Sequence, residues 1–201
     1  MKVLLIDDHA LFAKSLEIAL DGFPEIDTFS NTQNVENIIE QLEREKPDII
    51  LVDINLSNLN EEDGLILAKH ILQTIPKQKV VILSGYDLPV YRHEAQKIGA
   101  KGFINKNVEP EELVLILADI ENGKSYFPKE EVIIEELTDS EKEILQLVAS
   151  GMKRKEIASQ LFLSERTVSN HLQHIFDKLQ VSSTVEVVTK AIQMGYIAPI
   201  N

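Results

Sequence analysis

Short apolar runs recur through the first 122 residues and alternate with segments of helical periodicity. Runs at 3–6, 49–52 and 80–83 predict buried strands, and 26–30 and 102–105 predict two weaker ones. Between them, apolar residues recur every three or four positions, which is the spacing of an amphipathic helix. Five strands alternating with five helices predict right-handed βαβ units, and so a doubly wound α/β domain whose parallel sheet is covered on both faces.

The pattern changes after residue 122. Residues 123–136 carry Gly123, Pro128 and a charged run but little apolar periodicity, so we interpret them as an interdomain linker. Residues 137–201 have helical periodicity, with capping boxes at 138–141 and 183–186 and a capping Ser164 between them. Four helices in about 60 residues, with a short turn between the second and third, predict an all-α helix-turn-helix domain.

The composition fits an ordinary globular protein of one or two domains. The chain has 201 residues, of which 44% are hydrophobic and 26% charged. It contains no cysteine, which excludes disulfides, thiolate zinc sites and a cysteine nucleophile. No apolar run approaches the roughly 18–20 residues that cross a membrane, and Asp7 and Asp8 come too early for a signal peptide. We therefore expect a cytoplasmic protein without membrane association.

The net charge of −13 is unevenly distributed. Residues 1–125 hold 12 Lys or Arg and 22 Asp or Glu, whereas residues 137–201 hold seven of each. Within the second part, residues 152–178 carry five basic and three acidic side chains. This asymmetry indicates two domains with different tasks, and on charge alone DNA binding by the second is only one possibility.

Polar side chains follow four of the predicted strands. Asp7 and Asp8 come after the first, Asp53 ends the third, Ser84 ends the fourth and Lys106 follows the fifth. The carboxyl ends of parallel strands converge on the crevice where α/β folds bind ligands. Taken singly, each residue could be a strand end, a helix cap or a turn. Together, the carboxylates could hold a hard divalent cation, and the hydroxyl and ammonium could bind phosphoryl oxygens.

The segments that carry these side chains resemble the receiver domain of bacterial two-component response regulators. They are LIDDH at 5–9, DINL at 53–56, ILSGYD at 82–87 and GAKGFINK at 99–106. The resemblance implies that Asp53 accepts a phosphoryl group and that Lys106 and Ser84 bind it. It also implies a Mg²⁺ site, with ligands from Asp7, Asp8, Asp53 and the backbone carbonyl of Asn55. Ser84 and Phe103 would then form the conformational switch. An ordinary core aromatic is the alternative for Phe103, and His9 and His93 are interpreted as surface or capping residues.

One segment departs from the receiver pattern. The family usually continues after its phosphoacceptor with Met-Pro and places a glycine about eight positions on, but here Leu56 and Ser57 follow and Gly64 comes eleven positions on. The stretch 57–63 is thus about three residues longer than usual and ends in three acids. It could alter Mg²⁺ affinity or the phosphoryl lifetime, or it could be an ordinary solvated loop.

Residues 137–181 resemble the DNA-binding domain of the NarL/FixJ (LuxR-type) subfamily. The match includes KEIA at 155–158, LSERTVSNH at 163–171 and KLQV at 178–181. Val168, Leu172, Ile175 and Leu179 form the apolar stripe of the third helix. Its opposite side would enter the major groove, with Ser169, Asn170 and Gln173 toward base edges. The side chains expected at phosphates are Lys153, Arg154, Lys155, Arg166, Thr167 and Lys178. A solvated polar face is the alternative.

Three positions of this domain differ from the subfamily pattern. Ser169 stands where Lys is common, Lys153 where a capping Ser is common, and Thr184 where Arg is common. The loss of a cap costs roughly 0.5–2 kcal/mol, and the loss of a cation weakens contacts with DNA. We expect a single domain to bind weakly, so that dimerisation matters more.

Together, the two resemblances imply a transcriptional response regulator that is not a turnover enzyme. A sensor histidine kinase would phosphorylate Asp53, and phosphorylation would favour a homodimer that binds double-stranded promoter DNA. The stimulus, the promoters, the sign of regulation and the dimer face stay open. One alternative is a haloacid dehalogenase-type phosphotransferase, but that family has a second Asp where this chain has Asn55. Another is a regulator that acts through protein contacts without phosphorylation.

Overall fold

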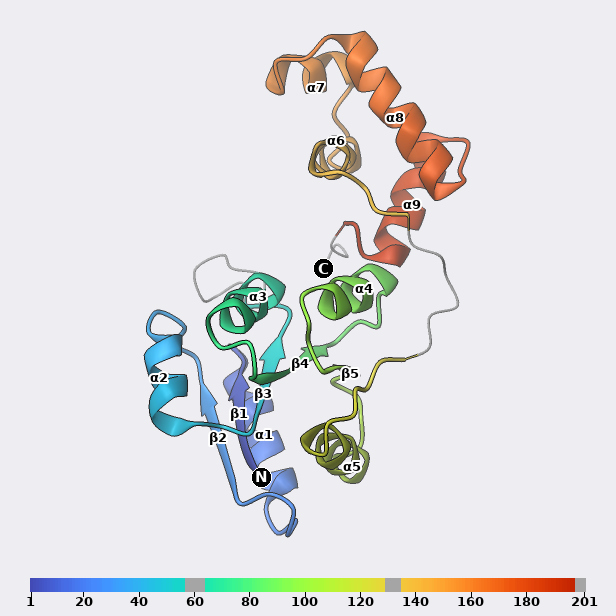
Figure 1. Cartoon of the computed structure of the whole chain (residues 1–201). Helices are drawn as coiled ribbons and strands as arrows, with labels where there is room; N and C mark the ends of the chain where they lie inside the picture. Colours follow the sequence, from blue (N-terminus) through green and yellow to red (C-terminus); the bar gives the residue numbers. More distant parts are fainter. Residues whose placement is uncertain (57–63, 129–134, 198–201) are drawn as a thin grey trace. The chain divides into compact units, whose positions relative to one another are not determined.

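The computed structural model describes residues 1–56, 64–128 and 135–197. Within them the chain forms two compact units, one built from the first part of the chain and the other from its last 70 or so residues (Figure 1). The lengthened stretch 57–63 lies outside the described residues.

A parallel sheet of five strands forms the centre of the first unit. The strands run in the order β2-β1-β3-β4-β5, as expected for a doubly wound fold. Their bounds are β1 Lys2–Ile6, β2 Thr28–Thr32, β3 Ile49–Asp53, β4 Lys79–Ser84 and β5 Gly102–Asn105. Four match the predicted runs within a residue or two. β2 starts two residues later than predicted, because Ile26 belongs to the preceding turn, where its N–H donates to Phe23 O.

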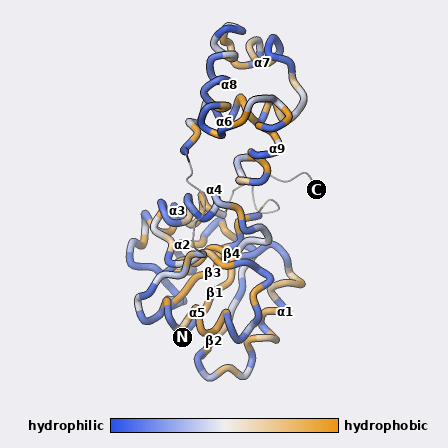
Figure 2. Tube along the Cα trace, turned by 90° about the vertical axis from the view of Figure 1, so that its right-hand side faces the viewer, coloured by the Kyte–Doolittle hydropathy of each residue, from blue (hydrophilic) through white to orange (hydrophobic). Residues whose placement is uncertain are grey.

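Helices cover both faces of this sheet, as predicted. The helices are α1 Ala10–Leu20, α2 Ile38–Glu45, α3 Gly64–Thr74, α4 Pro89–Lys97 and α5 Pro110–Glu121. α1 and α5 pack together on the face that carries Leu5, Leu51 and Leu83, and α2, α3 and α4 lie on the opposite face (Figure 1). β1, β3 and β4 are buried almost throughout, and Figure 2 shows the hydrophobic residues gathered along these central strands.

Part of the predicted linker pairs with the sheet. Tyr126 forms a parallel bridge with Gly102 of β5. Its N–H donates to Lys101 O, and its carbonyl accepts from Phe103 N–H, each at 2.9 Å. The segment that leaves α5 therefore covers the outer edge of β5, an arrangement that satisfies backbone groups at a sheet edge.

Residues 135–197 of the second unit contain four helices, and three of them begin directly after the capping residue that the sequence predicts. The four helices are α6 Asp139–Ala149, α7 Arg154–Gln160, α8 Glu165–Leu179 and α9 Thr184–Met194. Thr138 and Glu141 form the predicted capping box of α6, and Ser164 and Ser183 cap α8 and α9. Val168, Leu172, Ile175 and Leu179 are all buried, so the predicted stripe of α8 faces the core. Among the described helices, none combines the length and the apolar character needed to cross a bilayer.

Candidate functional site

The acidic residues meet at the point where the strand order reverses. Ile6 of β1 pairs in register with Val52 of β3. Asp7, which follows β1, and Asp53, which ends β3, therefore lie on neighbouring strands. Asp53 in turn pairs with Leu83, one residue before Ser84. Asp7 is 0% exposed and Asp53 is 1% exposed. The parallel register thus brings Asp53, Asp7 and Ser84 together at the carboxyl ends of three neighbouring strands.

Lys106 neutralises part of this negative charge. Its Nζ lies 2.8 Å from Asp7 Oδ2 and 2.8 Å from Asp53 Oδ2. The same ammonium stands 4.6 Å from the centre of the Phe12 ring, a cation–π distance. Lys106, which the sequence predicts to bind a phosphoryl group, thus pairs with both Asp53 and Asp7.

Burial dominates the electrostatics of Asp53. It raises the pKa of this carboxyl, and the nearby Asp7 carboxylate raises it further. Lys106 and the backbone N–H of Asn55 act in the opposite direction without cancelling the effect. One ammonium among three carboxylates leaves excess negative charge in a place with little water, which favours binding of a further cation.

His9 is exposed, as predicted for a surface residue, but its ring also lies beside these carboxylates, which the sequence did not predict. Its Nδ1 is 2.8 Å from Asp8 Oδ1, 3.1 Å from Asp7 Oδ1 and 3.7 Å from Asp53 Oδ2. His9 occupies the N-cap position of α1, but its side chain makes no capping hydrogen bond. Its place directly after the acidic pair was the signal that could have identified it.

The donor set fits a divalent cation. One ligand atom from each of Asp7, Asp8, His9 and Asp53 lies within 4.8 Å of the others. Asp53 Oδ2 is buried and, apart from its ion pair with Lys106, has no hydrogen-bond partner. An acidic cluster rich in carboxylate oxygens is typical of Mg²⁺ binding.

A hollow of about 530 Å³ opens beside Asp53. Its lining is His9, Leu11, Phe12, Ser15, Asp53, Asn55, Gly85 and Lys106. A Cβ added at Gly85 would meet nothing within 4 Å, so the space in front of this residue is open. A group of side-chain size can therefore approach the Asp53 carboxylate from this side.

The two predicted switch residues are both buried. Ser84 Oγ donates to Tyr86 O at 2.6 Å and accepts from Tyr86 N–H at 3.0 Å. Phe103 is 0% exposed, and its N–H is bonded to Tyr126. A displacement of either side chain would require its neighbours to move, because a packed interior has little free volume.

Gly64 lies against the backbone of Asp53, where only a glycine fits. Its N–H donates to Ile54 O at 2.8 Å, and a Cβ at this position would overlap the Asp53 carbonyl oxygen. The start of α3 therefore lies against the end of β3. This close approach is present although the glycine comes eleven positions after Asp53 and not about eight.

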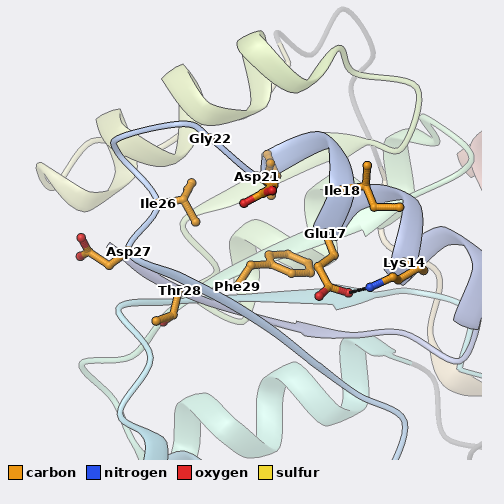
Figure 3. A pocket seen from close by; sticks show the side chains of 10 residues that line it. Lys14, Glu17, Ile18, Asp21, Gly22, Ile26, Asp27, Thr28 and Phe29 are labelled. Carbon is orange, nitrogen blue, oxygen red and sulfur yellow. Dashed lines mark hydrogen bonds and ion pairs between the residues drawn. The ribbon is translucent and has the colours of Figure 1, made fainter.

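A second hollow, of about 330 Å³, lies between α1 and β2 (Figure 3). Its most prominent polar feature is the ion pair of Lys14 with Glu17, at 2.9 Å. Its lining contains none of the site residues that the sequence predicts.

Most of the residues predicted to contact DNA are exposed on the second unit. Lys153, Arg154, Lys155, Arg166, Asn170 and Gln173 are exposed, and Thr167 and Ser169 are partly buried. Gln173 Nε2 donates to Asp177 Oδ1, and Ser169 Oγ donates to Glu165 O. These local bonds hold polar side chains along the outer face of α8, away from its buried stripe.

Lys178 is placed differently from the other predicted phosphate contacts. Its Nζ lies 2.7 Å from Glu141 Oε2 and 3.1 Å from Glu136 O. Burial acts to raise the pKa of Glu141, but Lys178 and the backbone and hydroxyl of Thr138 together hold it below its ordinary value. In this structure the ammonium therefore joins α8 to the start of α6 within the domain.

Two family models match the chain, one for each unit. The model described as response regulator receiver domain matches residues 3–118, and the model described as bacterial regulatory proteins, luxR family, matches residues 135–191. These matches confirm both resemblances that the sequence motifs indicate.

Whole proteins of similar length match over nearly the entire chain. The transcriptional regulatory protein DegU of Brevibacillus brevis is 28% identical over 227 residues, covering 98% of this chain and 95% of that protein. The oxygen regulatory protein NreC of Staphylococcus haemolyticus (strain JCSC1435) is 29% identical over 213 residues, with 96% and 97% covered.

Solved structures give the same result for the fold. The response regulator ChrA of a haem-sensing two-component system has a TM-score of 0.51 at 27% identity, over 98% of each chain. The RcsB–DNA complex has a TM-score of 0.70 at 23% identity, over 96% of this chain and 98% of that one. The chain therefore belongs to the DNA-binding response regulators of two-component systems, in which a receiver domain precedes a LuxR-family helix-turn-helix domain.

Proposed function

We propose that Asp53 accepts a phosphoryl group from a phosphohistidine of a partner sensor kinase, and that this modification favours a homodimer that binds promoter DNA. The observation that carries the proposal is the buried Asp53 carboxylate, 2.8 Å from Lys106 and beside two further carboxylates at the reversal of strand order. Charge and burial in this pocket both change when a phosphoryl group is added.

The chemistry is an in-line displacement at phosphorus. A carboxylate oxygen of Asp53 forms the new P–O bond while the P–N bond to the donor imidazole breaks, and the imidazole leaves with the electron pair and takes a proton from solvent. Lys106 compensates charge on the phosphoryl oxygens as they approach. The hollow lined by Asn55 and Gly85 admits the donor ring.

Mg²⁺ would be held by carboxylates of Asp7, Asp8 and Asp53 and by the backbone carbonyl of Asn55. When bound, it supplies the positive charge that offsets repulsion between these carboxylates and the incoming phosphate. Asp7 also accepts the backbone N–H of His9 at 2.7 Å, which fixes its carboxylate in the pocket.

A route from the pocket to the linker runs through β5. Ser84 and Lys106 are connected by the hydrogen bond from Lys106 N–H to Ser84 O at 2.8 Å. Phe103, on the same strand, is bonded through its N–H to Tyr126 at the beginning of the linker. A shift of Ser84 toward a phosphoryl group, followed by Phe103, would be transmitted to the chain that leads to the DNA-binding domain.

The helix-turn-helix would bind DNA with α8 in the major groove. Asn170 and Gln173 would face base edges, and the exposed Lys153, Arg154, Lys155 and Arg166 would lie near phosphates. Thr167 and Ser169 would contribute from the first turns of α8. The salt dependence of DNA binding by Lys178→Gln tests whether Lys178 also contacts phosphates.

The proposal is tested by incubating the protein with phosphoramidate and Mg²⁺. Intact-mass spectrometry should show the addition of one phosphoryl group in wild type and in the control Asp119→Asn, whose carboxylate is exposed and pairs with Lys124. Asp53→Asn should gain none, and only the modified wild type and control should elute as a larger species. A modified wild type with unchanged size would contradict the dimer, and equal modification of Asp53→Asn would exclude Asp53 as the acceptor.

A further inference from the structure

His9 presents a nitrogen to the same space as the carboxylates. The distances from its Nδ1 to one oxygen each of Asp8, Asp7 and Asp53 are 2.8, 3.1 and 3.7 Å. For an octahedral shell with metal–ligand bonds of about 2.1 Å, neighbouring ligands stand about 3.0 Å apart. The distances to Asp8 and Asp7 thus match the spacing of neighbouring ligands, and the 3.7 Å to Asp53 is somewhat longer.

The local backbone explains why the ring is there. His9 precedes α1, and its N–H is already used by Asp7 Oδ1. Its side chain makes no hydrogen bond that caps α1, so helix capping does not explain why the ring is turned toward the acids. The side chain is 57% exposed, which leaves the ring room to adjust to an ion without repacking the core.

We propose that His9 Nδ1 is a direct ligand of the divalent cation in this pocket, and that it shifts the preference of the site from Mg²⁺ toward Mn²⁺ and similar transition metals. Imidazole is a good ligand for transition metals, whereas Mg²⁺ favours oxygen donors. A site with one imidazole and several carboxylates therefore discriminates between the two ions more strongly than carboxylates alone. This inference rests on the proposed function, in which the pocket holds a divalent cation.

The direct test uses the wild-type protein with a substoichiometric amount of Mn²⁺. Electron spin echo envelope modulation should show a coordinated imidazole ¹⁴N. The signal should vanish in His9→Gln and persist in His70→Gln, which removes an exposed histidine of α3. Calorimetry should show Mn²⁺ affinity reduced by about tenfold or more in His9→Gln, with Mg²⁺ affinity changed much less.

The possible failures are distinguishable. If wild type binds Mn²⁺ and Asp8→Asn does not, but the wild-type spectrum shows no ¹⁴N coupling, the role of His9 is overturned. The metal site of the proposed function then stands. If neither Mn²⁺ nor Mg²⁺ binds wild type, the metal site and the inference built on it both fail. Because the decisive spectrum is recorded on the unaltered protein, the outcome does not depend on whether His9→Gln folds.

Discussion

Lys106 Nζ lies 2.8 Å from Asp53 Oδ2, and it is held in place by an equally short ion pair with Asp7. The Lys106 side chain is only 16% exposed, so little water screens the interaction. This pair connects the end of β3 with the residue that follows β5. The charge of Asp53 is thus paired within the first unit, although burial still raises the pKa of this carboxyl.

Replacement of Lys106 by Met should slow phosphoryl transfer to Asp53. The variant keeps an aliphatic chain over Phe12 but lacks the cation, so charge on the phosphoryl group is no longer compensated. We expect the rate of mass gain with phosphoramidate to fall by roughly 10²-fold, the usual effect of removing one such donor. Lys101→Met removes an exposed lysine at the opposite end of β5 and is the control. Equal rates in wild type and Lys106→Met would remove Lys106 from the transfer step.

Asp53→Asn should stabilise the protein at neutral pH. Because burial raises the pKa of Asp53 in the fold, the native state binds the proton more tightly than the unfolded state. The ionised carboxylate therefore reduces stability at neutral pH, and this penalty disappears as the pH falls toward and below the ordinary value of 3.8. We expect urea unfolding to give a gain on the order of 1–2 kcal/mol at about pH 7.5 and a smaller gain at about pH 4.5.

The control for this experiment is Asp119→Asn, an exposed acid on α5. It should change the unfolding free energy by no more than about 0.5 kcal/mol at either pH. A loss of stability in Asp53→Asn at neutral pH would mean that the attraction of Lys106 outweighs the burial of the carboxylate.

Gly64→Ala should destabilise the receiver domain and distort its acceptor site. The added methyl group would overlap the Asp53 carbonyl oxygen, so α3 or the end of β3 would have to move. We expect a loss of about 1–3 kcal/mol in urea unfolding, together with slower phosphorylation. Gly85→Ala is the matched control, since its Cβ would meet nothing within 4 Å, and its stability should stay close to wild type. A fully stable Gly64→Ala protein would show that the approach of α3 to Asp53 is not required.

Lys178 and Arg166 should differ in their effects on DNA binding. Arg166 is exposed, so Arg166→Gln should weaken binding to all sequences and reduce the slope of log K against log salt by about 1. Lys178 is paired with Glu141, so Lys178→Gln should instead lower the unfolding free energy by about 1–3 kcal/mol. Its salt slope should remain that of wild type. A reduced slope for Lys178→Gln would restore it to the phosphate contacts that the sequence predicts.

Glu141 gives this pair a defined dependence on pH. Its pKa in the fold is below the ordinary value of 4.5, so the carboxylate contributes stability at neutral pH that is lost as the pH falls through the lowered value. Glu141→Gln should be destabilised at about pH 7 by on the order of 1–2 kcal/mol, and this difference should shrink at about pH 4. If the difference in unfolding free energy between wild type and Glu141→Gln does not shrink at low pH, the loss of stability comes from packing and not from the missing charge.

Much of this structure is predictable from the chain because its local patterns agree with its packing. The apolar runs at 49–52 and 80–83 are central strands because buried parallel strands are hydrophobic on both faces. The parallel order then brings Asp7, Asp53 and Ser84 together. β2 is less well predicted because an edge strand is only partly buried and its apolar pattern is weak.

What the sequence does not reveal depends on side-chain direction and on pairing between distant segments. The bridge of Tyr126 with Gly102 has no local signal, because it forms through backbone groups. The sequence predicts Lys178 to be a surface cation of α8, but in the structure it pairs with Glu141, 37 positions away. For His9, the residue type and position were visible, but only the structure shows its ring turned toward the acids.

We expect phosphorylation of Asp53 to control DNA binding, and a titration with DNA measures this effect. A double-stranded site selected from a random pool is titrated with wild type and with Asp53→Asn, each with and without phosphoramidate and Mg²⁺, at fixed salt. The account predicts that affinity of the wild type rises by about tenfold or more, the range of common coupling energies, while Asp53→Asn does not respond. Equal affinity of phosphorylated and unphosphorylated wild type, with the phosphoryl group verified by mass, would contradict it.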